Sequence, residues 1–388
     1  MPPPNRRPPP IFLPMKVNLT LLFLLLLALP GIALARPGTV FEKKISESFP
    51  IRSDGQVRLD NRYGEIKVVT WSQPRVKIDV LIQVEAADKD EFQEVLNRID
   101  VALSGGNNMV SGVTTINSKR SSGSWWSFIT NSGGSNDFKI YYTVNLPATV
   151  KLEVDARYCD VELPNLTGET DLDVGYGDLV AGRLSARSMV DVSYGSARIE
   201  RLGANSTLKL RYSEGTVRNA GDLRYDGRYS EVRFGTVGVL HLDVGYDEVE
   251  VESAEAVHLT GSYNELSVEQ TAAAYLKGNY TDFNLGTVTR RLEMEGSYGD
   301  LEVERLAAGF ERVDVRVAYS DVQINVDDSA GYTLDLSARY GDIDAPTSSL
   351  DNRDVRSEGS SESVKGRKSG TGNGTIKIAV SYGDIEIY

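Results

Sequence analysis

Hydrophobic and polar residues alternate along most of the chain in a short unit that repeats many times. Each unit contains a tyrosine followed two positions later by an acid, as in GSYGDLEVE (296–304) and VSYGDIEI (380–387). Positions four and two before the tyrosine, and three and five after it, are small or apolar in nearly every copy. Apolar residues at every second position are typical of a strand with one buried face, so each unit predicts two short strands.

The spacing of the tyrosines defines the repeat. The intervals are nearly constant from Tyr158 to Tyr298 and slightly longer from there to Tyr340. The interval from Tyr340 to Tyr382 is twice the interval before it, so we expect an insertion to replace one coil there. The motif tyrosines are Tyr63, Tyr158, Tyr176, Tyr194, Tyr212, Tyr229, Tyr246, Tyr263, Tyr280, Tyr298, Tyr319, Tyr340 and Tyr382.

The alternation slips just after the tyrosine, which predicts a bend there. Pairs such as Gly-Asp, Ser-Glu and Asn-Glu fill the bend, and we expect these residues to supply its left-handed or turn dihedrals. The tyrosine itself continues the apolar face of the first strand. We expect the rings to form a ladder along one corner, where stacking favours one register over a slipped one.

A unit of this length cannot bury its inner face alone, whereas stacked units bury a continuous core. The sequence therefore predicts an all-β fold, a β-solenoid of about 12 coils with repeats of about 17–21 residues, over residues 151–388. With each coil adding about 4.8 Å, the array spans roughly 55 Å. A transmembrane β-barrel is the rival fold, but its strands need about 9–11 residues and these have about five.

Residues 36–150 do not follow the repeat and are expected to form a β-rich N-terminal cap. Phe92, Val95, Leu96 and Ile99 have helical spacing and predict one helix at about 86–103. Two loops are expected, a Gly/Ser-rich one at 119–137 and a polar, disordered one at 345–375 that loops out where a coil is skipped. The last strand, ending at Tyr388, is expected to close the array with an open edge.

Residues 1–35 are predicted to be a signal peptide, with Met15 as an alternative start of translation and cleavage after Ala33-x-Ala35. The 42 basic and 55 acidic residues give a net charge of −13, and loss of Arg6, Arg7 and Lys16 makes it −16. An acidic exported chain is a poor nucleic-acid binder. A single cysteine rules out a disulfide framework, and we interpret Cys159 as a turn substitution, with a reactive or pairing thiol as the alternative.

With NRYGEIKVVTW after an amphipathic first strand, one helix, the YTVNLP segment and serial Y-G-D or Y-S-E coils, the chain resembles the bacterial putative-adhesin family. The resemblance covers nearly all of 40–388. It implies an exported β-strand-repeat domain of unknown function, a β-solenoid at the bacterial envelope. It brings no catalytic residues to this sequence.

Acidic residues two positions after the tyrosines form a second predicted column. In register these acids lie about 5 Å apart. One interpretation is a row of weak Ca²⁺ contacts, and the other is a turn whose acids accept hydrogen bonds from local backbone N–H groups. The column is Asp160, Asp178, Glu214, Glu231, Glu248, Glu265, Asp282, Asp300, Asp321, Asp342 and Asp384.

Two further clusters are candidate sites. His241 and His258 lie one repeat apart and should be outward neighbours, and Glu293 is a conceivable third metal ligand, although plain surface residues explain them as well. The possible binding surface is Trp125, Trp126 and Phe128 in the 119–137 loop, because adjacent indoles are costly to expose. They either contact a ligand or pack on the end of the solenoid.

No nucleophile elbow, phosphate loop or zinc signature is present, so we expect no enzyme and no cofactor. The sequence favours a non-enzymatic exported solenoid, an adhesin or cell-envelope interaction protein at the cell surface or in the periplasm. Its partner would be an envelope protein or a glycan, with no transmembrane segment left after cleavage of the signal peptide. The alternatives are a periplasmic structural or envelope-stress signalling partner, and thirdly a polysaccharide-active enzyme.

Overall fold

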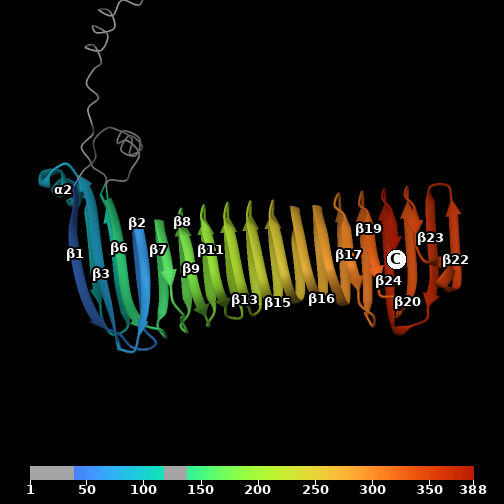
Figure 1. Cartoon of the computed structure of the whole chain (residues 1–388), viewed down its shortest axis with the longest axis horizontal. Coiled ribbons are helices and arrows are strands. Elements are labelled where there is room, and N and C mark those ends of the chain that lie inside the picture. The colour runs from blue at the N-terminus through green and yellow to red at the C-terminus, as the bar shows by residue number, and fades with distance from the viewer. Residues whose placement is uncertain (1–38, 118–137) are drawn as a thin grey trace, which may run out of the picture.

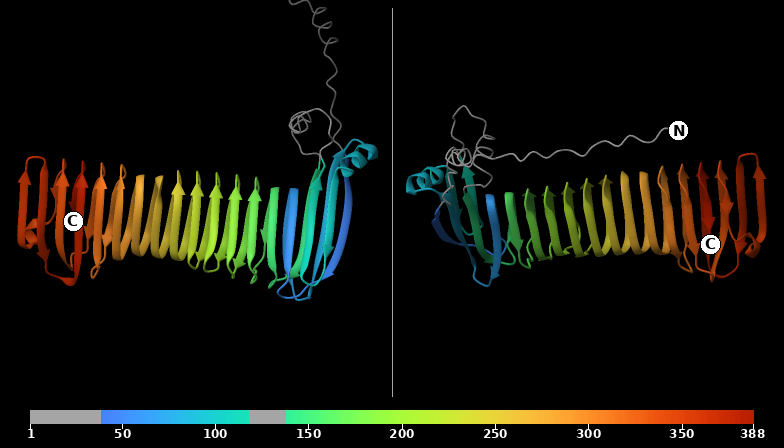
Figure 2. Two further views of the ribbon diagram at one scale, coloured as in Figure 1. Left: turned by 180° about the vertical axis from the view of Figure 1, so that it is seen from behind. Right: turned by 45° about the horizontal axis from the view of Figure 1, so that its top comes forward.

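The computed structural model describes residues 39–117 and 138–388. These residues form an all-β structure with one short α-helix and one 3₁₀ turn, as the alternating pattern predicted. The strands stand side by side in a long row, with the N-terminal strands at one end and β22 at the other (Figure 1). Two further views show the same elongated body, with antiparallel strands covering both ends (Figure 2).

The elements fall into three groups along the chain. The N-terminal group is β1 (Thr39–Pro50), β2 (Gln56–Trp71), β3 (Arg75–Ala86), α2 (Lys89–Leu96), β4 (Ile99–Gly105), β5 (Met109–Ile116) and β6 (Phe138–Pro147). The central group is β7 (Lys151–Leu163), β8 (Thr170–Gly175), β9 (Asp178–Leu184), β10 (Ser188–Ser193), β11 (Ser196–Leu202), β12 (Ser206–Arg211), β13 (Glu214–Ala220), β14 (Leu223–Arg228), β15 (Glu231–Gly245), β16 (Glu248–Ser297) and β17 (Leu301–Leu306). The C-terminal group is β18 (Arg312–Ala318), β19 (Val322–Val326), β20 (Ala330–Arg339), β21 (Ile343–Asp344), η1 (Thr347–Ser349), β22 (Asp351–Glu358), β23 (Ser361–Lys368), β24 (Thr371–Ser381) and β25 (Ile385–Ile387).

Each central coil contributes one strand to each of two parallel ladders. The strand before the tyrosine pairs with its equivalents in the neighbouring coils, so Val190 of β10 lies between Leu172 and Leu208. The strand after the tyrosine forms the second ladder in the same way, and Ile199 of β11 lies between Ala181 and Val217. Equivalent positions of successive repeats are therefore stacked in register, which is the geometry of a β-solenoid.

The core is a set of apolar columns between the two ladders. The residue four positions before each tyrosine is at most 3% exposed throughout the array, from Leu59 to Ile378. The columns three and five positions after the tyrosine are buried as well, with Leu179 and Val217 as examples, except after Tyr340, where Ile343 and Ala345 are half-buried. The turn position eight after it is also buried at Leu166, Leu184 and Leu202. These predicted core positions are confirmed.

The N-terminal cap extends the solenoid before closing it. β2 pairs in parallel with β7, and on its other edge with β5 and β6, so it is itself a coil of the array. β3 then pairs antiparallel with β6, β1 with β3, and β4 with β5. Asn61, the one polar residue at its inward position, is fully buried, donates to the Ile140 carbonyl at 2.9 Å and accepts from the Thr114 hydroxyl at 3.1 Å.

The helix is shorter than predicted. α2 ends at Leu96, because Ile99, Val101 and Leu103 belong to β4, which pairs antiparallel with β5. The apolar residues of this segment satisfy helical spacing up to Leu96 and strand spacing after it, so the prediction of 86–103 merged two elements. The helix begins where the Asp88 carboxylate accepts hydrogen bonds from the backbone N–H groups of Asp90 and Glu91, both at 3.0 Å.

The C-terminal coil is not at the end of the array, contrary to the prediction. β24 pairs in parallel with β18 on one side and with β20 on the other, so the last segment of the chain fills a slot between two earlier coils. Ile378 consequently lies between Val315 and Leu336. The predicted open edge at this strand does not exist.

Most of the predicted loop at 345–375 is ordered as strands. β23 pairs antiparallel with the outer edge of β20, and β22 pairs antiparallel with β23. The polar composition of this segment follows from its position, because all eight residues of β22 are exposed at the end of the molecule. Charged residues on such an edge discourage pairing with another chain.

Candidate functional site

The backbone of every coil turns at its motif tyrosine. All thirteen of these tyrosines are left-handed, with φ between 51° and 64°. The prediction placed the left-handed dihedrals on the two following residues, and this is wrong. A left-handed residue interrupts the alternation of side chains, so the tyrosine ring points outward and the next side chain points into the corner.

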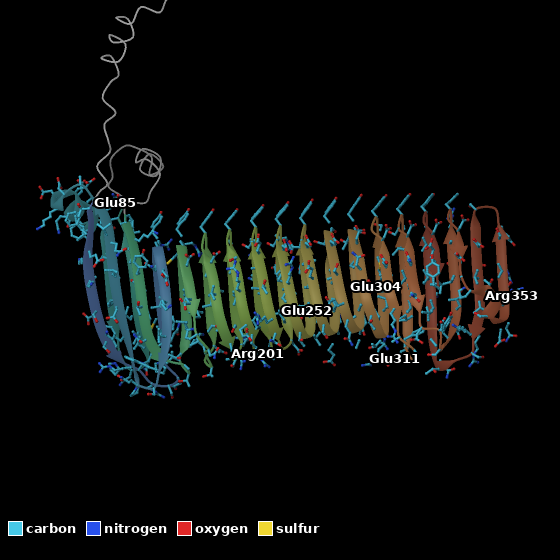
Figure 3. All side chains as sticks on the ribbon, viewed as in Figure 1. Glu85, Arg201, Glu252, Glu304, Glu311 and Arg353 are labelled. Atoms are coloured by element: carbon cyan, nitrogen blue, oxygen red, sulfur yellow. The ribbon has the colours of Figure 1, made fainter. Side chains whose placement is uncertain are left out.

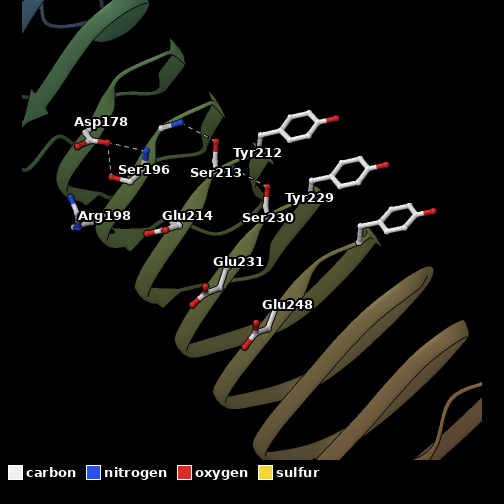
Figure 4. Close-up of a pocket in the computed structure, with 12 residues that line it drawn as sticks. Asp178, Ser196, Arg198, Tyr212, Ser213, Glu214, Tyr229, Ser230, Glu231 and Glu248 are labelled. Atoms are coloured by element: carbon white, nitrogen blue, oxygen red, sulfur yellow. Dashed lines mark hydrogen bonds between the residues drawn. The ribbon is translucent and has the colours of Figure 1, made fainter. Parts of the chain in front are cut away.

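The outward rings form a continuous stack, which we call the tyrosine ridge. Neighbouring ring centroids are 4.7–5.1 Å apart and the rings are within 12° of parallel. From Tyr158 onward each side chain is 42–52% exposed, so the tyrosine does not belong to the buried face as predicted. Figure 4 shows Tyr212 and Tyr229 projecting away from their corners with their rings parallel. In Figure 3 aligned side chains run along one long edge of the molecule, whereas the labelled Arg201 and Glu311 lie near the other.

Where the residue after the tyrosine has a side chain, that side chain points into the interior of the corner. Ser213, Ser230, Asp247 and Asn264 occupy this position and are at most 7% exposed. The backbone N–H of Ser213 donates to the Ser230 hydroxyl at 3.2 Å, and that of Ser230 donates to Asp247 Oδ1 at 2.9 Å. The backbone N–H of Asp247 donates in turn to Asn264 Oδ1 at 3.0 Å. Each polar side chain thus accepts a hydrogen bond from the backbone N–H at the corner of the preceding coil.

In other coils this position is a glycine because there is no space for a side chain. A Cβ on Gly195 would lie 2.0 Å from the carbonyl oxygen of Gly177 in the preceding coil. The φ of Gly195 is not in the left-handed range, so the glycine is required by the close approach of two coils.

The acidic residues two positions after the tyrosines have two different roles. Where the residue is aspartate, its carboxylate caps the next coil: Asp160 accepts from the backbone N–H of Asp178 at 2.9 Å, and Asp178 accepts from that of Ser196 at 3.0 Å. Where it is glutamate, the backbone bonds go to carbonyls instead, as from the Glu231 N–H to the Ser213 carbonyl at 3.2 Å. Within residues 39–117 and 138–388, no group of three or more His, Cys, Asp or Glu could hold a metal ion.

Two shallow grooves flank the tyrosine ridge. One, of about 680 Å³, lies between the ridge and the glutamates and is lined by Tyr212, Tyr229, Tyr246, Glu214, Glu231 and Glu248 (Figure 4). The other, of about 770 Å³, lies on the opposite side of the same rings over Gly245, Ser262 and Asn279. The grooves differ in net charge, because acids outnumber bases in the lining of the first, whereas two acids and two bases balance among the small residues of the second.

A buried polar cluster contacts Ser230, which lines the first groove. Tyr225 takes the place of the usual aliphatic residue four before the tyrosine, and its hydroxyl donates to Asp247 Oδ2 at 3.3 Å. Gly227 makes the space, since a Cβ there would lie 1.7 Å from Asp247 Oδ2. Burial raises the pKa of Asp247 to about 6, against the smaller opposing effect of its hydrogen bonds. Burial also raises the pKa of the Tyr225 phenol far above its usual range.

Cys159 occupies the same inward corner position as Ser213 and Asp247. It is 1% exposed, its sulfur accepts from Asn61 Nδ2 at 3.3 Å, and burial raises the pKa of its thiol to about 12. The thiol is therefore protonated at neutral pH and inaccessible to reagents in solution.

The two histidines lie on adjacent coils in the first ladder. Their ring centroids are 4.7 Å apart, and His258 also stacks on Tyr275 at 4.6 Å. Burial, with a smaller effect from His241, lowers the pKa of His258. Glu293 lies further along this column, beside Asp314, and does not complete a metal site with the histidines.

The predicted binding residues Trp125, Trp126 and Phe128 lie outside the described residues. The structure instead brings together residues that the sequence treated as structural, because the ridge, the glutamates and both grooves share one corner. The signal that could have identified the outward rings is the residue after the tyrosine. Its recurrent choice among Gly, Ser, Asn, Thr, Asp and Cys is typical of a tight buried corner.

Comparison with known proteins identifies a family. A family model described as Toastrack DUF4097 matches residues 114–388. None of the curated proteins compared with the chain matches it. Among the described residues, no helix has both the length and the apolar character needed to span a membrane.

Solved structures resemble the chain at low identity. A putative cell adhesion protein from Clostridium sporogenes is 10% identical, with 89% of this chain and 99% of that chain covered and a TM-score of 0.19. A putative adhesin from Parabacteroides distasonis is 11% identical, with 90% and 98% covered and a TM-score of 0.28. Another from Parabacteroides merdae is 8% identical, with 90% and 97% covered and a TM-score of 0.23. Likeness at these TM-scores has no bearing on what this chain binds.

Proposed function

Because the chain belongs to the Toastrack DUF4097 family, we propose that it is an exported, non-enzymatic protein that presents a rigid repetitive surface for adhesion or other cell-envelope interactions. Its body is a β-solenoid in which each coil is formed by one repeat of the tyrosine motif. The partner is an extended envelope polymer, a glycan or a protein, that contacts several coils at once.

The tyrosine ridge is the observation that supports this proposal. Thirteen left-handed tyrosines each carry a backbone cost of about 1–2 kcal/mol, whereas glycine would occupy the same corners without strain. Stacking offsets part of this cost, at about 0.5–1.5 kcal/mol for each aromatic pair. Exposed aromatic rows of this length are unusual on a protein that meets only water.

The geometry of the ridge indicates the kind of partner. Ring faces are covered by neighbouring rings, so a partner meets ring edges and hydroxyls that repeat about every 4.8 Å. The two grooves run beside the rings, and the one lined by Glu214, Glu231 and Glu248 carries an excess of carboxylates, whereas acids and bases balance in the other. A linear partner that lies along a groove makes the same contacts at each coil, and weak contacts then add up.

The location of the protein in its native organism tests the adhesion proposal. Intact cells are treated with a protease, and the chain is followed with an antibody raised against residues 36–388. The exposed turn at Gly359 and Ser360, between β22 and β23, is the site where cleavage is expected first. Cleavage in intact cells is the result we expect.

Protection from the protease until the outer envelope is opened would overturn the adhesion proposal. It would favour the periplasmic alternative, a structural or envelope-stress signalling partner. A matched sample of permeabilised cells shows that the protease cuts the folded chain once it has access.

A further inference from the structure

We propose that the tyrosine ridge is a site of oxidative modification, at which a one-electron oxidant joins tyrosines of neighbouring coils as dityrosine. The substrate is the pair of stacked phenols, and the oxidant is a haem peroxidase using hydrogen peroxide. The product is a covalent cross-link between two coils. This inference does not depend on the adhesion proposal.

The first requirement of the reaction is a close pair of phenols. Along the ridge every ring has a neighbour at 4.7–5.1 Å, and Tyr246 and Tyr263 are within 1° of parallel. Parallel in-register rings place the same ortho carbons of two phenols opposite each other. Rotation of the half-exposed side chains is then needed to bring two ortho carbons to bonding distance.

The second requirement is access to the oxidant. The ridge tyrosines from Tyr158 to Tyr382 are 42–52% exposed. Within the part of the chain that the structure describes, the ridge phenols from Tyr158 to Tyr319 make no hydrogen bond to another residue. Oxidation of these phenols therefore breaks no hydrogen bond within the chain. The buried tyrosines Tyr142, Tyr225 and Tyr332 lack this access and serve as internal controls.

The chemistry balances with hydrogen peroxide as the oxidant. Each of two phenols loses one electron and one proton to give a tyrosyl radical. The two radicals form a carbon–carbon bond between ortho carbons, and both rings regain their hydroxyl groups when the two ortho hydrogens move to the oxygens. Hydrogen peroxide takes up the two electrons and two protons and leaves as two molecules of water. Each cross-link therefore lowers the mass of the chain by two hydrogens.

The order of the coils dictates which pairs can form. Tyr382 stacks on both Tyr319 and Tyr340, at 4.7 Å in each case, because β24 lies between β18 and β20. Cross-links should therefore join Tyr319 to Tyr382 and Tyr382 to Tyr340. A link between Tyr319 and Tyr340, which are neighbours in the motif order, should be absent.

The experiment treats the full mature chain, at low concentration, with a haem peroxidase and hydrogen peroxide. Dityrosine fluorescence, the intact mass and mass spectrometry of the proteolysed chain are measured. We expect a monomer that has lost hydrogens in pairs, with cross-linked peptides only from ridge neighbours. The exposed Tyr388, which is outside the ridge, should contribute no intramolecular link.

The matched variant is Tyr229→Phe, which keeps an aromatic ring in the stack but removes one phenol. It should lose the Tyr212–Tyr229 and Tyr229–Tyr246 peptides and retain the Tyr263–Tyr280 peptide. Absence of dityrosine in the folded wild type, or links between arbitrary tyrosines at the same yield as in chain unfolded by denaturant, would overturn the proposal. Links formed only between separate molecules would overturn it as well.

Discussion

At the scale of the residue, the motif tyrosine combines a strained backbone with an exposed ring. The left-handed φ turns the chain between its two ladders, while the backbone N–H remains paired, as from Tyr194 to the Arg211 carbonyl at 3.0 Å. An L-residue with a Cβ is disfavoured in this conformation, and the stack compensates for part of the cost. This combination makes the effect of a substitution differ from that in an ordinary strand.

Replacement of Tyr246 tests the strain directly. Tyr246→Gly and Tyr246→Ala both lose two stacked neighbours at 4.8 Å, but only alanine retains the left-handed cost. We expect the alanine variant to be about 1–2 kcal/mol less stable than the glycine variant in denaturant unfolding. In a regular strand the order is reversed, because glycine is the less stable of the two by about 0.5–1 kcal/mol. An alanine variant as stable as the glycine variant would show that the corner is not left-handed.

Asp247 gives the molecule a pH dependence. Its pKa is raised from 3.8 to about 6, mainly by burial. Below pH 3.8 both the folded and the unfolded chain hold the proton, so the full stability is present there. Between pH 3.8 and about 6 the unfolded chain ionises while the folded chain keeps its proton, so the free energy of unfolding falls by on the order of 3 kcal/mol across this range.

Asp247→Asn should remove this fall. The amide can accept from the Ser230 N–H and donate to the Tyr225 oxygen without ionising, so the contacts are preserved. We expect the variant to equal the wild type at acid pH and to exceed it in stability at pH 8, measured by denaturant unfolding. Glu255→Gln, at an exposed position, is the control and should follow the wild type. If the free energy of unfolding changed with pH in the same way for the wild type and for Asp247→Asn, ionisation of the buried Asp247 would not be the cause of the pH dependence.

At the scale of the element, the insertion of β24 and β25 is the main departure from simple stacking. β20 is held between β23 on one edge and β24 on the other. The chain therefore completes its core with its last segment, which separates two coils that are consecutive in sequence. Loss of packing in β24 should loosen both of its neighbours.

Ile378→Ala tests this arrangement. Ile378 is 1% exposed, and the cavity left by truncation should cost about 2–5 kcal/mol. Amide hydrogen exchange should show lost protection in β18 and β20 together. Val355→Ala, in the exposed strand β22, is the control and should stay within about 0.5 kcal/mol of the wild type. Loss of protection in β20 without any in β18 would contradict the inserted position.

The sequence predicted the parts of the fold that depend on local periodicity. The buried columns at Leu208 or Val217 follow from alternation, which is a local signal. The position of β24 could not be predicted, because strands with the same pattern can pair in any order. The outward rings were missed because a left-handed residue reverses the face of the side chain without changing the hydrophobic pattern.

At the scale of the whole molecule, both ends of the solenoid are closed by antiparallel strands with charged outer edges. Lys43, Lys44 and Glu47 lie on β1, and Asp351, Arg353 and Asp354 lie on β22. These ends discourage end-to-end association and leave the long corner as the extended feature of the surface. The net charge of −13 also opposes self-association.

The central claim is that the tyrosine ridge contacts the partner. The most direct test compares the mature chain with a variant carrying Tyr212→Asn, Tyr229→Asn and Tyr246→Asn in binding to cell-wall, vesicle and membrane-protein fractions of the native organism. Asparagine tolerates the left-handed corner, so the coils should persist while three rings are lost. The control carries Asn219→Ala, Thr236→Ala and Ser253→Ala on the same three coils, away from the ridge.

The account predicts that one fraction binds the wild type and the control equally and binds the asparagine variant at least about tenfold more weakly, a loss of about 1.4 kcal/mol. Circular dichroism of the three proteins verifies that the fold is unchanged. Equal binding by the asparagine variant and the wild type would contradict the claim and assign binding to another surface of the molecule.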